Sequence, residues 1–198
     1  MFENSNDEWV AGLDVEYNTT LDKEKNLKEE EKMQPAVIQV CVHGLCLVYH
    51  ICHAEVECEE FKNFLKGGLV KFVTVDFRND KTVLGQIGLV VGNPFDLQKN
   101  GLLPSRDQSS MLTLAGAMVH PSYGKLKKHP HTFHRHAWER NVLDIDHIHY
   151  AAMDGYLCFN IYKGWMKSRS QVCGSSKEVS AKRKRDKDEV EDVDEDSE

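Results

Sequence analysis

The first candidate for chemistry is an acidic pair, Asp14 and Glu16, within residues 8–17, where apolar and polar side chains alternate toward the end of the segment. The alternation predicts a β-strand, so both carboxylates project from one face, about 7 Å apart along the chain. Two such groups repel each other unless a cation or a basic group lies between them. Because hard divalent cations prefer oxygen ligands, the pair is a candidate metal site. The polar outer face of an edge strand is the alternative.

A second candidate pair, Tyr150 and Asp154, lies in a segment that we expect to be a long helix. Residues i and i+4 of a helix share one face, one turn apart, so the two side chains become neighbours. A phenol there can position a water molecule, and the carboxylate can bind a metal ion. The alternative is a tyrosine at the core boundary that bonds to an ordinary helix carboxylate. Asp80 is a weaker candidate, because an aspartate just before a helix is usually a cap.

The elements that must position these side chains begin with strands and continue as alternating strands and helices. We expect strands over residues 8–17, 36–42 and 45–51, the last two joined as an antiparallel hairpin at Gly44, and then a helix that stops before Gly67. Further along we expect a strand over 70–75, a helix over 81–88, a strand-like run over 89–91, a helix capped by Ser109 or Ser110 through 118, and a long helix from Asp144 or Asp146 through about 166. This order predicts an α/β fold with a mixed sheet flanked by helices.

In order and spacing, the candidate residues resemble the three motifs of the DEDDy group of 3′-to-5′ exonucleases. The motifs are Leu13-Asp14-Val15-Glu16, then Phe72-Val73-Thr74-Val75 leading to Asp80 and Leu84, and Ile148-His149-Tyr150-Ala151-Ala152-Met153-Asp154. Supporting similarity comes from Ile38-Gln39-Val40, Asn93-Pro94-Phe95-Asp96-Leu97, Trp138, and Asp154-Gly155-Tyr156 in place of the usual Asp-Ala-Tyr. The chain looks most like the Werner-syndrome-type and ribonuclease D-like exonuclease domains of the plant branch. The resemblance implies a ribonuclease H-like mixed sheet within an exonuclease-like domain over residues 8–170.

What the resemblance implies for the site can be stated residue by residue. Asp14, Glu16 and Asp154 would hold one metal ion, Asp14 would be shared with a second ion, and Asp80 would steady the second ion directly or through water. Tyr150 would orient the attacking water. Two Mg²⁺ or Mn²⁺ ions about 3.5–4 Å apart would then support release of nucleoside monophosphates from a 3′ end. The alternative is an exonuclease-fold protein of weak or no activity that binds nucleic acid or protein.

The sequence departs from this family pattern at two places. Family members usually carry another strand and helix before motif one, so we expect a truncated N-terminal edge, and the exposed edge could serve as a homo-oligomer surface. In motif two, Thr74 and Asp76 replace glycines. Asp76 is also a rival for the motif-two role, but it lies four residues early, which favours Asp80.

Nucleic acid, with a single-stranded or recessed 3′ end of DNA or RNA, is the partner that the resemblance implies. The basic, histidine-rich residues 125–140 stand where such domains have a loop near the substrate groove. There, Lys127, Lys128 and Arg135 could bind backbone phosphates, and Phe133 could stack on a base. Any solvated loop can be basic, which is the alternative, and nothing in the sequence decides between DNA and RNA.

Two groups of histidines and cysteines raise the question of zinc. One consists of His129, His131, His134 and His136, and the other of Cys41, His43, Cys46, His50, Cys52 and His53. Neither has the spacing of a familiar zinc finger, and the predicted hairpin would send alternate side chains of the second group to opposite faces. The sequence therefore disfavours a structural zinc site.

Composition bounds the remaining properties. The formal charge of −7 is an average, because much of it lies in residues 177–198, which lack the apolar surface to fold. We expect residues 171–198 to be a disordered tail, basic and then acidic, whose run Ser180-Ala181-Lys182-Arg183-Lys184-Arg185 is compatible with nuclear import, with cytoplasm as the alternative. The sequence contains no run of about 18 apolar residues, so we expect no membrane span. We expect the cysteines to be buried free thiols.

Overall fold

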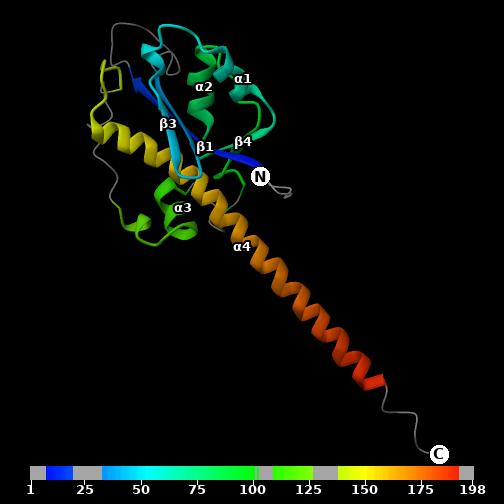
Figure 1. Cartoon of the computed structure of the whole chain (residues 1–198). Coiled ribbons are helices and arrows are strands. Elements are labelled where there is room, and N and C mark those ends of the chain that lie inside the picture. Colours follow the sequence, from blue (N-terminus) through cyan, green and yellow to red (C-terminus); the bar gives the residue numbers. More distant parts are fainter. Residues whose placement is uncertain (1–7, 20–32, 101, 103–108, 127–137, 192–198) are drawn as a thin grey trace, which may run out of the picture. The chain divides into compact units, whose positions relative to one another are not determined.

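One mixed β-sheet organises the part of the chain that the computed structural model describes, residues 8–19, 33–100, 102, 109–126 and 138–191 (Figure 1). The strand order is β3-β2-β1-β4-β5. The strands are β1 (Trp9–Thr19), β2 (Met33–Val42), β3 (Leu45–Tyr49), β4 (Val70–Thr74) and β5 (Pro94–Asp96). β1 pairs antiparallel with β2, and β2 with β3, whereas the β1–β4 and β4–β5 pairs are parallel. The predicted mixed sheet is confirmed, with β1 and its acidic pair at the centre rather than at an edge. Loss of a strand before residue 8 stays a prediction.

The helices follow the predicted order with small shifts. They are α1 (Glu59–Lys66), α2 (Arg78–Gln86), α3 (Met111–Met118) and α4 (Ile145–Glu191), together with the short 3-10 helices η2 (Ile51–His53) and η3 (Tyr123–Lys125). Ser110 caps α3 as predicted, since its side chain accepts a hydrogen bond from the backbone N–H of Thr113 at 3.3 Å. In the described residues, no helix combines the length and apolar character needed to cross a membrane.

The strand expected over residues 89–91 is wrong, because the fifth strand is Pro94–Asp96. Backbone N–H groups at the start of this segment and directly after it donate to the ends of two helices instead. Leu89 N–H donates to Leu84 O at the end of α2, and Gly92 N–H donates to Leu65 O at the end of α1. Pairing with β4 begins only where Phe72 N–H reaches Asn93 O, at 2.9 Å.

α4 continues to Glu191, well beyond the end expected at about residue 166. Residues 177–191 are rich in lysine, arginine and glutamate, which are good helix formers even where apolar surface is scarce. The chain divides into two compact units, residues 1–162 and 163–198. The predicted domain over 8–170 and the predicted disorder of 171–198 in solution stay predictions.

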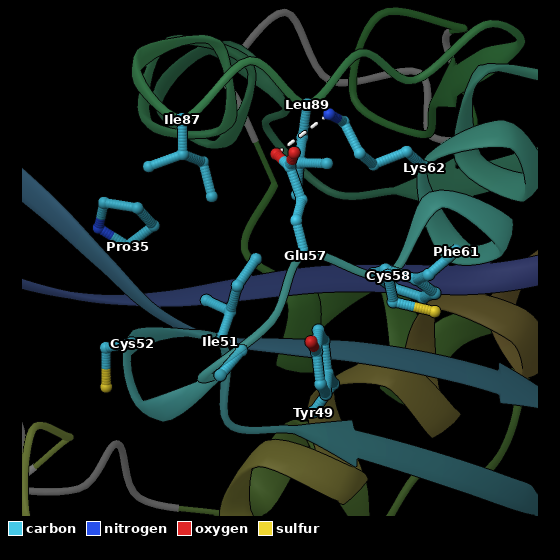
Figure 2. Close-up of a pocket in the computed structure, with 11 residues that line it drawn as sticks. Pro35, Tyr49, Ile51, Cys52, Glu57, Cys58, Phe61, Lys62, Ile87 and Leu89 are labelled. Carbon is cyan, nitrogen blue, oxygen red and sulfur yellow. Dashed lines mark ion pairs between the residues drawn. The ribbon is translucent and has the colours of Figure 1, made fainter.

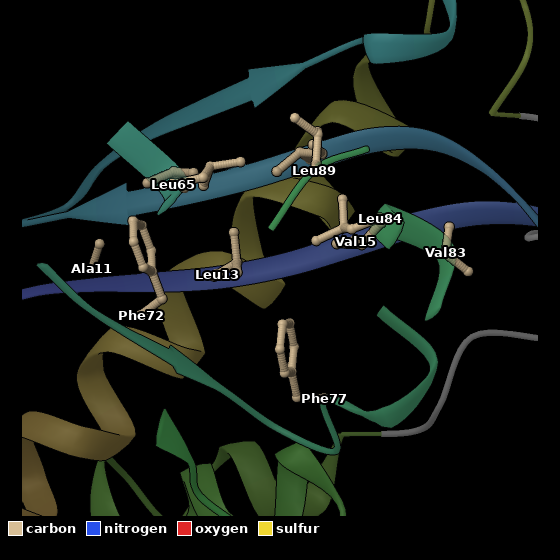
Figure 3. Packing of buried hydrophobic residues seen from close by; sticks show 11 residues of the cluster. Ala11, Leu13, Val15, Leu65, Phe72, Phe77, Val83, Leu84 and Leu89 are labelled. Atoms are coloured by element: carbon tan, nitrogen blue, oxygen red, sulfur yellow. The ribbon is translucent and has the colours of Figure 1, made fainter. Parts of the chain in front are cut away.

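The apolar core lies on one face of β1. Ala11, Leu13 and Val15 are buried there, against Phe72 of β4 and a set of side chains from the helices and loops (Figure 3). That set is Leu65, Phe77, Val83, Leu84 and Leu89. The alternation along β1 therefore works as predicted, because it leaves Asp14 and Glu16 on the opposite face.

α4 packs on that opposite face against Gly12, where β1 carries no side chain. A Cβ atom built on Gly12 of β1 would lie 2.1 Å from the carbonyl oxygen of Gly155 and 2.7 Å from the backbone nitrogen of Phe159. Such distances are impossible for a real Cβ, so only glycine permits the helix backbone to approach the strand this closely. The contact places Asp154, the neighbour of Gly155, beside the acidic face of β1.

Candidate metal centre and active site

Three carboxylates from two elements converge on one point. Asp14 and Glu16 of β1 and Asp154 of α4 each offer an oxygen, and these atoms lie within 4.8 Å of one another. All three side chains are half-buried. The group satisfies the ligand chemistry of a hard divalent cation, which takes carboxylate oxygens and completes its shell with water or substrate. Two of the predicted motifs, far apart in sequence, are thus brought together.

Asp80, the motif-two candidate, lies outside this group of three but within its electrostatic reach. α2 begins at Arg78, so Asp80 lies in the first turn of the helix rather than at its cap, and the N-cap residue is Phe77. Its side chain is buried, at 6% exposure. A carboxylate this deeply buried is costly without a compensating charge, which a cation beside Asp14 would supply.

Burial raises the pKa of all four carboxyl groups, and neighbouring carboxylates add to the effect at Asp14, Glu16 and Asp80. Burial is the main reason that the pKa of Asp14 lies well above its usual value, and Asp80, Asp154 and Glu16 add to the effect. Burial, then Asp154 and Asp80, likewise raise the pKa of Glu16. Burial raises the pKa of Asp154 to about 7, against a lowering by the hydrogen bond from Tyr150. The pKa of Asp80 is also raised to about 7, first by burial and then by Asp76 and Asp96. A divalent cation would relieve this repulsion.

Tyr150 lies beside Asp154, as the helical spacing predicts. Its phenol and the Asp154 carboxylate form a side-chain hydrogen bond. Burial, and then the negative charge of Asp154, raise the pKa of Tyr150, so the phenol keeps its proton near neutral pH. The fully buried Trp138 packs against it, with ring centroids 6.1 Å apart. Tyr150 is therefore a fixed hydrogen-bonding group rather than a base.

The turn between β4 and α2 is held by Asp96, which the sequence indicated only as part of a supporting similarity. Its carboxylate accepts hydrogen bonds from the backbone N–H groups of Asp76, Phe77 and Gln98, at 3.2, 3.3 and 3.0 Å. These bonds fix the turn that leads into the first residues of α2. Asp96 is thus a positioning residue for Asp80. In the sequence, only its place in the segment Asn93-Pro94-Phe95-Asp96-Leu97 pointed to it.

The two residues that replace glycines in motif two behave differently. Asp76 adopts a φ of 59°, the left-handed conformation that glycine favours. Its carboxylate pairs with Arg78, with Nε to Oδ1 at 2.6 Å and Nη2 to Oδ2 at 2.9 Å, which supports Asp80 as the better motif-two candidate. Thr74 is fully buried, and its hydroxyl has no hydrogen-bond partner among the described residues.

The predicted nucleic-acid contacts and the two histidine and cysteine groups are not part of the acidic cluster as described. Lys127, Lys128, Phe133 and Arg135, and the group His129, His131, His134 and His136, lie outside the described residues. The described cysteines are free thiols, as predicted: Cys41, Cys46, Cys52, Cys58 and Cys158. The expected burial is wrong for Cys52 and Cys58, which are exposed. From the second histidine and cysteine group, His50, Cys52 and His53 converge, so the argument from alternating hairpin faces is wrong for these three residues.

A pocket of about 250 Å³ lies apart from the acidic residues (Figure 2). Tyr49, Ile51 and Phe61 contribute apolar walls, and an ion pair between Lys62 and Glu57, at 2.8 Å, lies at one side. None of the predicted site residues lines this pocket. The candidate active site is therefore defined by its carboxylates and not by this cavity.

No protein-family model and no curated protein matches the chain. Among solved structures, Escherichia coli RNase D, an exoribonuclease involved in structured RNA processing, is similar at 16% identity and a TM-score of 0.60, over 79% of this chain and 38% of that chain. The EXO domain of Aedes aegypti Nibbler is similar at 13% identity and a TM-score of 0.62, over 83% of this chain and 81% of that chain. Brucella melitensis NrnC bound to pGG is similar at 15% identity and a TM-score of 0.62, over 87% of this chain and 78% of that chain, and NrnC has also been solved with bound Mg²⁺. The chain therefore has the ribonuclease H-like fold of the DEDD 3′-to-5′ exonucleases.

Proposed function

We propose that this chain, which has the DEDD exonuclease fold, is a metal-dependent 3′-to-5′ exonuclease. It would hydrolyse phosphodiester bonds from the 3′ end of a nucleic acid and release nucleoside monophosphates. The observation that carries the proposal is the convergence of Asp14, Glu16 and Asp154 within 4.8 Å, with the buried Asp80 in their electrostatic field. Such a cluster is unfavourable by itself and becomes favourable with divalent cations.

The donor set fits Mg²⁺ or Mn²⁺, because every candidate ligand is a carboxylate oxygen. Asp14, Glu16 and Asp154 would hold one ion, Asp14 would be shared with a second, and Asp80 would hold the second directly or through water. Bound ions would supply charge stabilisation for the attacking and leaving oxygens of an in-line displacement. Support for divalent metal comes from the similar NrnC fold, which has been solved with Mg²⁺.

Tyr150 would orient the attacking water. Its raised pKa keeps the phenol protonated, so that it can donate to Asp154 while its oxygen accepts a hydrogen bond from water. Packing against Trp138 limits the movement of the ring, which favours one water position.

Nucleic acid with a single-stranded or recessed 3′ end is the proposed substrate, either DNA or RNA. The similar NrnC fold has been solved bound to pGG. We retain Lys127, Lys128, Phe133 and Arg135 as the proposed phosphate and base contacts, and nuclear residence as the proposed location. Leu45 and Leu47 are exposed on the edge strand β3, at 81% and 50%, which supports association of two copies through that edge.

A second candidate is a nucleic-acid- or protein-binding module of weak activity. Asp76 is the observation that favours it, because a non-glycine residue with a φ of 59° stores backbone strain beside the turn that leads to Asp80. Strain at this turn could displace Asp80 from its metal-binding position.

Degradation of 3′-labelled and 5′-labelled DNA and RNA, with Mg²⁺ or Mn²⁺, separates the two candidates. We expect metal-dependent shortening from the 3′ end, and its loss in both Asp14→Ala and Asp154→Asn. Asp146→Asn is the matched control, since Asp146 is an exposed carboxylate on the same helix as Asp154. No shortening by a folded protein that binds Mn²⁺ would favour the binding module.

A further inference from the structure

A second cluster of metal-binding side chains lies where the hairpin ends. His50, Cys52 and His53 each offer one ligand atom, and these atoms lie within 4.8 Å of one another. They gather because β3 ends at Tyr49 and the chain then turns as the 3-10 helix Ile51–His53. A continuing strand would have left His50 and Cys52 on one face and placed His53 on the opposite face.

Hydrogen bonds to backbone carbonyls orient both imidazole rings. His50 Nε2 lies 2.7 Å from the oxygen of Trp138, and His53 Nε2 lies 2.9 Å from the oxygen of Glu139. A carbonyl oxygen only accepts, so each Nε2 carries the proton and each Nδ1 keeps a lone pair. In metal-binding histidines the ring nitrogen that does not bind the ion commonly donates to a carbonyl or carboxylate, so binding through Nδ1 would keep both hydrogen bonds.

We propose that His50, Cys52 and His53 form a binding site for Zn²⁺ or a chemically similar transition-metal ion, with one imidazole nitrogen from each histidine and the Cys52 sulfur as ligands. The thiol would release its proton to solvent on binding. The described residues supply three ligands, and a water molecule would be the fourth. Imidazole and thiolate ligands favour zinc over magnesium, so this site would select a different ion from the all-oxygen cluster of Asp14.

The dimensions of the cluster suit a tetrahedral ion after a small contraction. Bonds of about 2.0–2.1 Å to nitrogen and about 2.3 Å to sulfur place tetrahedral ligands about 3.3–3.6 Å apart. The present separations of up to 4.8 Å would therefore close by about 1 Å, which side-chain rotation can supply. Cys52 and His53 are exposed and free of core packing. Cys52 lies at the side of the pocket away from the Glu57–Lys62 ion pair (Figure 2).

The imidazoles of the proposed site contact a segment that is distant in sequence. The carbonyls that hold His50 and His53 belong to Trp138 and Glu139, 88 and 86 residues further along the chain. Trp138 also packs against Tyr150 of the candidate active site. A metal ion here would stabilise this junction, and the expected effect is on melting temperature rather than on the chemistry at Asp14.

Cobalt titration of the full, reduced and metal-free chain tests the site, because a thiolate bound to Co²⁺ gives a charge-transfer absorption band that carboxylates do not. We expect one equivalent of Co²⁺ to produce the band and Zn²⁺ to abolish it. Cys52→Ser should lose the band, and His53→Ala should bind Co²⁺ at least tenfold more weakly. Cys58→Ser, Asp14→Ala and His120→Ala, which alter residues outside the cluster, should keep it.

Absence of the band in the wild-type chain, or its persistence in Cys52→Ser, would overturn the proposal. Melting curves give a second readout that does not depend on cobalt. Zn²⁺ should raise the melting temperature of the wild-type chain and of Cys58→Ser but not of Cys52→Ser. An equal rise in all three proteins would place zinc elsewhere and reject the site.

Discussion

Tyr150 is the candidate site residue whose role depends on keeping its proton. Its hydrogen bond lowers the pKa of Asp154, which burial raises to about 7. The hydroxyl therefore acts on the carboxylate beside it as well as on the water that it would orient.

Tyr150→Phe removes the hydroxyl and keeps the ring that packs against Trp138. We expect kcat to fall about 10–100-fold, the usual cost of losing a group that orients a metal ligand. The ascending limb of the pH–rate profile should move to higher pH, because Asp154 loses the hydrogen bond that lowers its pKa. A loss of kcat with an unmoved pH profile would show that the hydroxyl acts only on water.

At the residue scale, the sequence predicts the strand carboxylates from physical chemistry alone, because alternation is enough to put Asp14 and Glu16 on one face. Asp80 needed the family resemblance, since its helix begins at Arg78 and a cap was the simpler interpretation. The convergence of His50, Cys52 and His53 could not be predicted from the alternation of side chains in the hairpin. The face of every side chain beyond Tyr49 depended on where β3 ends, and periodicity locates strand ends poorly.

At the element scale, the contact between β1 and α4 determines the site. Gly12 lets the two backbones touch at the carbonyl oxygen of Gly155, and the acidic residues lie directly beside this contact. No sequence pattern revealed it, because a glycine within a strand equally suggests a bulge.

Gly12→Ala should disturb both stability and the site. The new methyl group would lie 2.1 Å from Gly155 O, so β1 or α4 must shift. We expect the free energy of unfolding to fall by about 1–3 kcal/mol, the usual cost of overpacking a core. Mn²⁺ affinity should fall as well, because Asp154 moves relative to Asp14.

Gly85→Ala is the control for Gly12→Ala, measured by urea unfolding and Mn²⁺ titration. Gly85 lies in α2, and a Cβ there meets nothing within 4 Å. The alanine should be neutral or stabilise by up to about 1 kcal/mol through helix propensity. Unchanged Mn²⁺ affinity in Gly12→Ala would mean that the close contact does not set the carboxylate spacing.

Helices and strands were predicted correctly where a local sequence signal determines them. They were predicted wrongly where hydrogen bonds to distant residues determine the backbone conformation. α3 began at its predicted cap because Ser110 needs only its own helix. Residues 89–91 looked like a strand, but Leu89 N–H donates to the end of α2 and the following Gly92 N–H donates to Leu65 O of α1, a partner distant in sequence that a local pattern does not reveal.

At the scale of the whole molecule, the buried carboxyls couple metal binding to stability. A carboxyl whose pKa rises on folding holds its proton more tightly in the folded chain. Between the unfolded value of about 4 and the folded value of about 7 for Asp80 and Asp154, the folded chain binds more protons. The free energy of unfolding contributed by these groups therefore falls as pH rises through that window.

The metal-free chain should thus lose stability between about pH 4 and pH 7, relative to a chain without one of these groups. Melting curves of wild type and Asp80→Asn in a chelator test this, and the slope against pH should be flatter in the variant. Mg²⁺ should restore more stability above pH 7 than near pH 5, because it binds the ionised carboxylates. Parallel slopes for the two proteins would contradict the raised pKa of Asp80.

The close contact between Gly12 of β1 and the backbone of α4 determines which positions tolerate substitution. Backbone contact, rather than the size of any side chain, sets the separation between the strand and helix carboxylates. Substitutions in the apolar cluster around Leu13 and Phe72 can therefore vary the margin of stability while the ion-binding geometry persists. Position 12 lacks this freedom, so we expect substitutions to accumulate in the apolar core but not at Gly12.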